Sequence, residues 1–169
     1  MRGSSGDFAA VYAGQRDHLL RIAVLVAGER ELAEEAVADA VARTWHRWDR
    51  TDISDPGAYL RRAVINAVTD RIRGRSRDRD RVRDARAAGV PLATGVSDAV
   101  VDHRVLIEAM ATLPFDHRVV LVLRYFDDQS EADTATTLGV PVGTVKSRTA
   151  RALAAMAEAL RETEEVRDA

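Results

Sequence analysis

The sequence of 169 residues contains no cysteine, and only 5% of its residues are aromatic. The absence of cysteine excludes a disulfide scaffold and any zinc or iron–sulfur site with thiolate ligands. Apolar runs are short, since stretches such as Ile22–Ala27 and Val119–Leu123 meet a charged residue within a turn or two. A membrane helix needs about 18 apolar residues, and the N-terminus lacks an apolar core of signal-peptide length. These absences predict a cytoplasmic protein that does not insert into a membrane.

Patterns typical of catalysis and of metal binding are also missing. The four histidines share no metal-ligand spacing; they are His18, His46, His103 and His117. The sequence has no glycine-rich phosphate loop and no recognisable serine–histidine–aspartate arrangement. We therefore expect neither an enzyme nor a protein that requires a cofactor or a metal ion.

Charged residues are abundant, at 31% of the chain for a net charge of −2, but they are unevenly distributed. Tyr59–Arg86 holds ten arginines against four aspartates, whereas Asp102–Ala169 holds eight basic against twelve acidic residues. Within that acidic part, Thr144–Arg151 carries three basic residues and no acid. Two local basic patches on a neutral or acidic body are compatible with nucleic-acid binding, although the net charge argues weakly against it.

Apolar residues recur at three- and four-residue steps nearly throughout, which predicts helices and almost no strands. Gly28, Pro114 and Gly139 mark expected helix ends, and Asp55-Pro56 is a capping acid followed by a first-turn proline. The expected helices are Asp7–Ala27, Arg30–Trp48, Pro56–Arg75, Val101–Leu113, Phe115–Phe126, Ser130–Leu138 and Pro141–Glu162.

The segment between the third and fourth expected helices has a different composition. It begins with RDRDRVRDAR, whose Asp–Arg neighbours favour a solvated extension of the third helix. It continues with Gly89, Pro91 and Gly95, which favour a flexible chain. We therefore expect an all-α fold of two small helical domains, 7–75 and 101–162, joined by a flexible linker at 76–100.

The strongest local pattern is SEADTATTLGVPVGTVKSRTARAL at 130–153. Ser130 is suited to cap a short helix, with Asp133 three residues on. That helix ends at Leu138-Gly139, and a second helix follows a tight turn, which is the punctuation of a helix-turn-helix. The second helix of such a unit places its N-terminal residues in the major groove. The alternative is an ordinary amphipathic hairpin with a solvated basic face.

The second helix of this unit is expected to have two faces. The face toward DNA consists of Lys146, Ser147, Ala150 and Arg151. The inward face consists of Val145, Leu153 and Met156. Arginine can pair with guanine through two hydrogen bonds, whereas Thr144 and Arg148 are better placed for backbone phosphate.

Four segments can be compared with a known family. In chain order they are AEEAVADAVARTWHRW, DPGAYLRRAVINAVTDRIRGR, LPFDHRVVLVLRYFDDQSEADTATTLG and VPVGTVKSRTARAL. They resemble parts of the extracytoplasmic-function (ECF) sigma factors of bacterial RNA polymerase. The first two segments resemble the polymerase-binding helix and the promoter-melting helix of domain two. The last two resemble the first part of domain four and its recognition helix. The sigma-E-like group of actinobacteria is the suspected branch. The resemblance covers Phe8–Arg75 and Val101–Leu160.

The resemblance implies a role for particular residues. Core polymerase binding falls on Glu35, Asp39, Arg43 and Arg47. Minus-10 DNA binding falls on Arg61, Arg62, Asn66, Asp70 and Arg73, while the loop Asp49–Asp55 corresponds to one that captures a flipped base. Minus-35 DNA binding falls on Thr144, Lys146, Ser147, Arg148 and Arg151. One departure is Ala38, which stands where the family often has glutamine.

The implied function is that of a sigma factor, which binds core RNA polymerase, directs promoter-specific initiation and is held inactive by an anti-sigma factor. A stand-alone helix-turn-helix regulator remains an alternative, and so does a helical adaptor that binds acidic proteins. Glu35 and Asp39 are also compatible with plain solvated acids. We expect Trp45 and Trp48 in the core, while Tyr59 is equally compatible with the core and with DNA contact.

Overall fold

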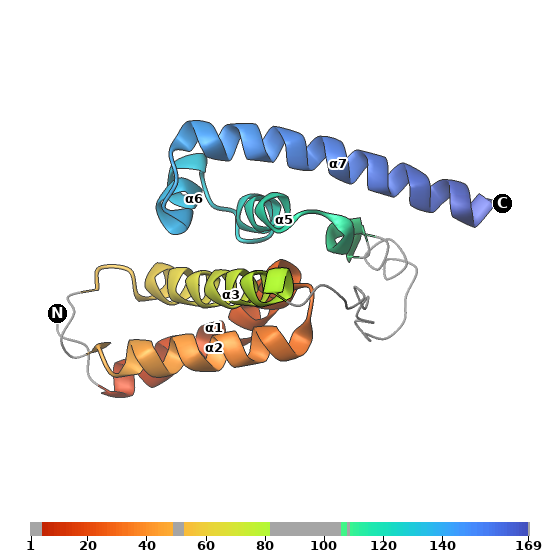
Figure 1. Cartoon of the computed structure of the whole chain (residues 1–169). Helices are drawn as coiled ribbons and strands as arrows, with labels where there is room; N and C mark the ends of the chain where they lie inside the picture. Colours follow the sequence, from red (N-terminus) through yellow and green to blue (C-terminus); the bar gives the residue numbers. More distant parts are fainter. Residues whose placement is uncertain (1–4, 49–52, 82–105, 108, 169) are drawn as a thin grey trace. The chain divides into compact units, whose positions relative to one another are not determined.

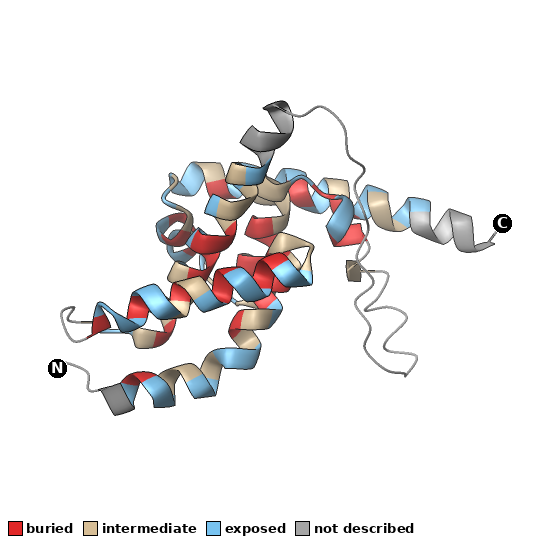
Figure 2. Ribbon diagram, turned by 60° about the horizontal axis from the view of Figure 1, so that its bottom comes forward, coloured by how far each residue is buried: buried red, intermediate tan, exposed pale blue. Residues whose placement is uncertain are grey.

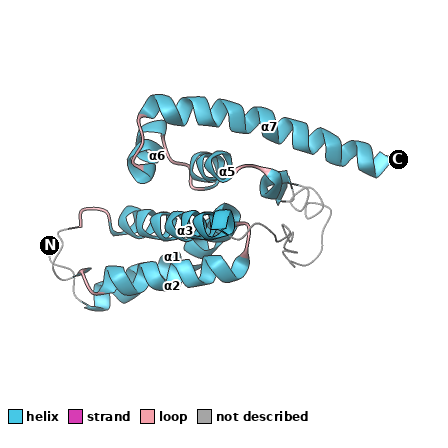
Figure 3. Ribbon diagram, in the orientation of Figure 1, coloured by secondary structure: helices cyan, strands magenta, loops and turns pink. Residues whose placement is uncertain are grey.

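The computed structural model describes residues 5–48, 53–81, 106–107 and 109–168. Side chains are described for residues 7–48, 53–75, 106–107 and 109–162. All regular structure in these ranges is helical (Figure 3). The chain divides into two compact units, Met1–Ala87 and Ala88–Ala169. The expected all-α fold with two helical regions is therefore confirmed. Val105 and the loop residues 49–52 lie outside the described residues, as do 82–104.

The first unit consists of α1 (Ser5–Ala27), α2 (Arg30–Trp45) and α3 (Pro56–Arg81), each of which packs against the other two (Figure 1). Gly28 ends α1 as expected, because its φ of 71° lies in the left-handed region that glycine adopts without strain. Its N–H donates to the Val24 carbonyl at 2.8 Å, which satisfies one of the last free carbonyls of the helix.

The core of this unit comes from one side of each helix, and Figure 2 shows buried residues recurring between exposed ones along the helices. Completely buried side chains include Leu19, Ile22, Val26, Leu60, Val64, Ile65 and Val68. Trp48 is buried as expected, with its ring 5.0 Å from that of Phe8. The expectation for Trp45 is wrong, because 43% of this residue is exposed. It lies at the last position of α2, and its ring centroid is 5.2 Å from that of Phe8 in an edge-on arrangement.

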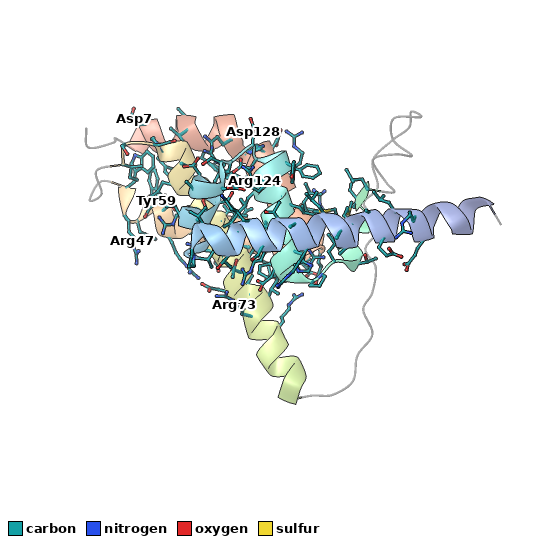
Figure 4. The ribbon with its side chains drawn as sticks, turned by 90° about the horizontal axis from the view of Figure 1, so that it is seen from above. Asp7, Arg47, Tyr59, Arg73, Arg124 and Asp128 are labelled. Carbon is teal, nitrogen blue, oxygen red and sulfur yellow. The ribbon has the colours of Figure 1, made fainter. Side chains whose placement is uncertain are left out.

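α3 begins as its sequence predicts, with the Asp55 carboxylate accepting from the Ala58 N–H at 3.0 Å. It runs to Arg81, beyond the predicted end at Arg75, through the alternating Arg and Asp residues. The charged run therefore extends the helix as far as Arg81, and the rest of the run lies outside the described residues. Tyr59, which is labelled in Figure 4, lies in the first turn and is half-buried.

The second unit contains α5 (Phe115–Leu121), a π-helical turn η2 (Val122–Phe126), α6 (Glu131–Leu138) and α7 (Val142–Asp168). The sequence predicts one α-helix over Phe115–Phe126, but its last turn widens, and the Asp127 N–H donates to the Val122 carbonyl five residues back. All residues of Val119–Leu123 are buried. A helix buried on every side is a central element, and α5 packs on α7 while η2 packs on α6.

Candidate nucleic-acid and polymerase interfaces

The predicted helix-turn-helix is present in the second unit, where α6 is joined to α7 by a tight turn (Figure 1). The Ser130 hydroxyl accepts from the Asp133 N–H at 3.0 Å and caps α6, as expected. Gly139 ends α6 with a φ of 65°, and its N–H donates to the Ala135 carbonyl. α7 starts after Pro141, whose carbonyl accepts from the Thr144 N–H at 2.9 Å.

A polar network fixes α6 to the π-helical turn. The Gln129 side chain donates to the Asp127 carboxylate at 2.6 Å and accepts from the Thr137 hydroxyl at 3.2 Å. Its backbone carbonyl accepts from the Arg124 guanidinium, whose residue is labelled in Figure 4. Because Thr137 lies on α6 and Arg124 on η2, Gln129 sets the orientation of the first helix of the unit against its support.

The two faces of α7 largely follow the expectation. Lys146, Ser147, Ala150 and Arg151 are exposed, and together they are called the recognition face below. Val145 and Met156 are buried as expected, but Leu153 is 45% exposed and the buried position is Ala152 instead. Steps of seven and four residues separate Val145, Ala152 and Met156, which is the helical repeat of a single stripe, whereas Leu153 lies one residue off it.

Two of the predicted DNA-binding cations form ion pairs within the unit. Arg148 is half-buried and its Nη2 lies 3.0 Å from Oδ2 of Asp116 on α5. Lys146 Nζ lies 3.6 Å from Oε2 of Glu131, the first residue of α6. Sequence reasoning missed both acids, because each lies far from its partner along the chain. The pair with Asp116 indicates that Arg148 also anchors α7 on α5.

In the first unit, α3 has one exposed face made of Arg62, Asn66, Asp70 and Arg73, called the α3 face below. Steps of four, four and three residues keep these side chains on one side of a helix. Arg73 is labelled on α3 in Figure 4. Arg61 lies off this face and close to Gly57, one turn earlier on α3. A side chain at Gly57 would place its Cβ 3.3 Å from Nη1 of Arg61, and the same position faces Gln15 of α1. The structure thus brings together four of the five residues predicted to contact minus-10 DNA.

The acids predicted to bind polymerase, Glu35 and Asp39, lie one turn apart on α2 and are called the α2 acids below. Arg71 of α3 donates from Nη2 to Asp39, and its Nε lies 3.7 Å from Oε2 of Glu35. Arg43 lies 3.5 Å from Asp39 on the next turn of α2, and Arg47 is exposed beyond the helix end. The hydrogen bond from Arg71 holds the pKa of the Asp39 carboxyl below its usual value. Sequence reasoning did not single out Arg71.

None of the helices in the described part of the chain has the length and hydropathy that crossing a lipid bilayer requires. Within the same residues, histidine and acidic side chains nowhere gather in a group of three that could hold a metal ion.

Comparison with known proteins identifies both units. Residues 11–78 match the family profile for sigma-70 region 2, and residues 103–156 match that for sigma-70, region 4. The RNA polymerase sigma-E factor of Streptomyces antibioticus is 34% identical over 160 residues, which cover 94% of this chain and 87% of the relative. The ECF RNA polymerase sigma factor SigW of Bacillus subtilis is 30% identical, covering 95% of this chain and 92% of the relative. The chain belongs to the ECF sigma factors.

Solved structures agree with this family. The sigma factor RpoE, in complex with the anti-sigma factor NepR from Bartonella quintana, is similar to this sigma factor with a TM-score of 0.73. The identity is 26%, and the match covers 92% of this chain and 97% of that one. As a sigma factor the chain binds RNA polymerase and promoter DNA, and it is not itself an enzyme. The match to region 2 excludes a stand-alone helix-turn-helix regulator, which has no need of that region.

A buried hydroxyl in the helix-turn-helix of this sigma factor carries a stability prediction. Thr134 on α6 is completely buried, and within the described residues its hydroxyl has no hydrogen-bond partner. Replacing Thr134 with valine, which has the same shape and branching, should raise the free energy of unfolding by about 1 kcal/mol, because a buried unpaired polar group costs about 1–3 kcal/mol. Urea denaturation measures this. Thr136→Val is the control. The exposed Thr136 hydroxyl donates to the Ala132 carbonyl at 3.0 Å, so its removal should not raise the free energy of unfolding.

The pair between Lys146 and Glu131 predicts an effect on DNA affinity. An exposed ion pair contributes about 0.2–1 kcal/mol, and the Glu131 carboxylate also repels phosphate. Glu131→Gln should therefore tighten promoter binding, up to about fivefold at low salt. Holoenzyme affinity measured as a function of salt concentration tests this. Glu158→Gln removes a similar pair, with Arg161, farther along α7 and should leave affinity unchanged. An unchanged affinity in Glu131→Gln would contradict the prediction.

Proposed function

We propose that this sigma factor uses three separate surfaces in initiation. The α2 acids, with Arg43 and Arg47, contact the core polymerase. The α3 face engages the melted minus-10 strand, and the recognition face of α7 reads the minus-35 duplex, with Thr144 and Arg148 near the phosphates. The observation that carries this proposal is that the α2 acids, the α3 face and the recognition face each lie on one side of one helix, whereas Arg47, Arg61 and Arg148 lie outside these faces.

The minus-35 assignment has physical support at the start of α7. Thr144 lies in the first turn of α7, where the positive end of the helix dipole favours an anion such as a phosphate. Lys146, Ser147 and Arg151 follow within two turns and are exposed. Side chains in this position of a helix-turn-helix contact base edges in the major groove.

The minus-10 assignment has support in the mixture of groups on the α3 face. Arg62 and Arg73 supply charge for phosphates, while the Asn66 amide can donate to and accept from a base. Holding an unstacked base offsets part of the energy needed to open the duplex, which is a few kcal/mol per base. Strand opening on this surface thus needs no nucleotide hydrolysis.

Asn66 provides the sharpest test of the minus-10 assignment. Asn66→Ala should lower open-complex formation about tenfold on promoters that carry the preferred minus-10 base, because a lost base contact is worth about 1–3 kcal/mol. Permanganate reactivity of the opened thymines measures it. Arg62→Ala is the comparison, since a lost phosphate contact should weaken all promoters alike. An Asn66→Ala holoenzyme that opens every promoter normally would contradict the assignment.

Transcription from a promoter library with added core polymerase tests the function as a whole. Initiation should depend on two short sequence blocks at a constant spacing, since two readers are held by one polymerase. Tight binding of the purified chain to duplex promoter DNA as a dimer, with no binding to core polymerase, would contradict the proposal.

We further propose that the two domains are 7–75 and 101–162 with a linker at 76–100, that the protein acts in the cytoplasm, and that an anti-sigma factor controls it. The last point is supported by the similarity to RpoE of Bartonella quintana, whose structure contains an anti-sigma factor. A partner that co-purifies with the tagged chain should block transcription when added to the reconstituted holoenzyme. A partner that leaves transcription unchanged would not be an anti-sigma factor.

A further inference from the structure

Arg71 connects the two functional helices of the first unit. It lies on α3, directly after Asp70 of the α3 face, but its own side chain is only 25% exposed and reaches α2. There it meets both α2 acids, Asp39 through Nη2 and Glu35 through Nε at 3.7 Å. One guanidinium therefore spans two carboxylates on successive turns of another helix.

The contact with Arg71 reduces the electrostatic repulsion between two acids of α2. Two acids four residues apart on a helix repel each other, and each carboxylate has several rotamers to choose from. Arg71 offsets one of the two negative charges and holds both side chains through a contact to each carboxylate. The low pKa of Asp39 is consistent with this contact, because the hydrogen bond from Arg71 favours the charged carboxylate.

The acids remain accessible to a partner while Arg71 holds them. The side chain of Asp39 is 45% exposed and that of Glu35 is 56% exposed. The ion pairs with Arg71 use Oδ2 of Asp39 and Oε2 of Glu35, so the second oxygen of each carboxylate is available for another donor. A carboxylate can bind an internal and an external cation together.

We propose that Arg71 is a positioning residue for polymerase binding, which holds Glu35 and Asp39 in the arrangement that the core polymerase recognises. The inference rests on the proposed role of the α2 acids as polymerase contacts. Binding is tighter when side chains are ordered beforehand, because less conformational entropy is lost on association. Arg71 therefore acts through the acids and not by touching polymerase.

Arg71→Ala should weaken binding of the full-length chain to core polymerase about tenfold, within the range typical of coupled sites. Arg71→Lys should recover less than half of this loss, because an ammonium is a point charge that cannot span both carboxylates. The matched control is Arg75→Ala, one turn further on α3, where Nη1 lies 2.6 Å from Oε2 of Glu29 instead of an α2 acid. Its affinity for core should stay within about twofold of wild type.

A second readout separates positioning from a loss of stability. The carbon-13 NMR titration of the Asp39 carboxyl should show a higher pKa in Arg71→Ala than in wild type, and no change in Arg75→Ala. Both carboxylates remain about half exposed, so loss of these ion pairs should cost little folding free energy, and circular dichroism should show all variants folded. If Arg71→Ala unfolds, Arg71→Lys still decides, because the proposal requires this folded variant to bind core more weakly than wild type.

The outcomes distinguish this inference from the function on which it rests. If Glu35→Gln and Asp39→Asn bind core normally, the proposed polymerase surface is wrong. If those two bind weakly while Arg71→Ala binds as wild type, only the positioning role is wrong. Tighter binding by Arg71→Ala would also overturn it, since Arg71 would then compete with polymerase for the acids.

Discussion

Replacing Arg151 with alanine is expected to weaken holoenzyme binding by about 1–3 kcal/mol, or roughly 5- to 150-fold, on promoters with the preferred minus-35 sequence. Arg151 is exposed on the recognition face, four residues after Ser147. Unlike Lys146 and Arg148, it makes no ion pair with any residue in the described part of the chain. Its guanidinium is thus available to pair with O6 and N7 of a guanine.

The measurement is the affinity of holoenzyme for a set of promoters that differ only in the minus-35 element. The loss should be confined to sequences with one particular base and should be nearly absent from those that lack it. Arg161→Ala is the matched control on the same helix, since that exposed residue pairs with Glu158 beyond the helix-turn-helix. An equal loss on every sequence, with a weaker salt dependence, would place Arg151 on a phosphate instead.

Signals that act over a few residues were predictable from the sequence. The ends of helices at Gly28, Asp55, Ser130 and Gly139 are set by backbone geometry and by capping within four residues, and the structure has each of them where it was predicted. The same holds for the recognition face, because its members share one helix. The family resemblance then supplied the order of the two regions, which local patterns do not encode.

Features that depend on distant contacts were not predictable. Nothing near Arg148 or Lys146 in the sequence indicates that Asp116 and Glu131 are their partners. The error at Leu153 has a different cause, because the helical spacing from Val145 and Met156 already favours Ala152, which is the buried residue. The exposure of Trp45 follows from where α2 ends against α1.

The position of Arg71 shows most clearly where sequence reasoning stops. Its neighbours Asp70 and Arg73 were assigned to the DNA side of α3, and a residue between them draws no separate prediction from spacing. Only the packing of α3 against α2 reveals that this position faces the acids of the other helix. A pairing across two helices is a property of their crossing and not of either sequence.

Two core substitutions should each destabilise one unit of the protein by about 2–5 kcal/mol. Leu60 on α3 and Leu123 on η2 are both completely buried, and alanine leaves a cavity at either position. For a unit of this size each kcal/mol lowers the unfolding temperature by roughly 4–8 °C, so shifts of about 10 °C or more are expected. Hydrogen exchange followed by mass spectrometry measures the protection of each helix separately.

Each variant is the control for the other, because Leu60 and Leu123 belong to different compact units. Leu60→Ala should raise exchange throughout α1, α2 and α3 while α5, α6 and α7 keep their protection, and Leu123→Ala should do the reverse. Losses at sites that share no partners add, so the double variant should show both effects in full. Loss of protection in both units from either single substitution would mean that they unfold together, which contradicts the proposed division into domains 7–75 and 101–162.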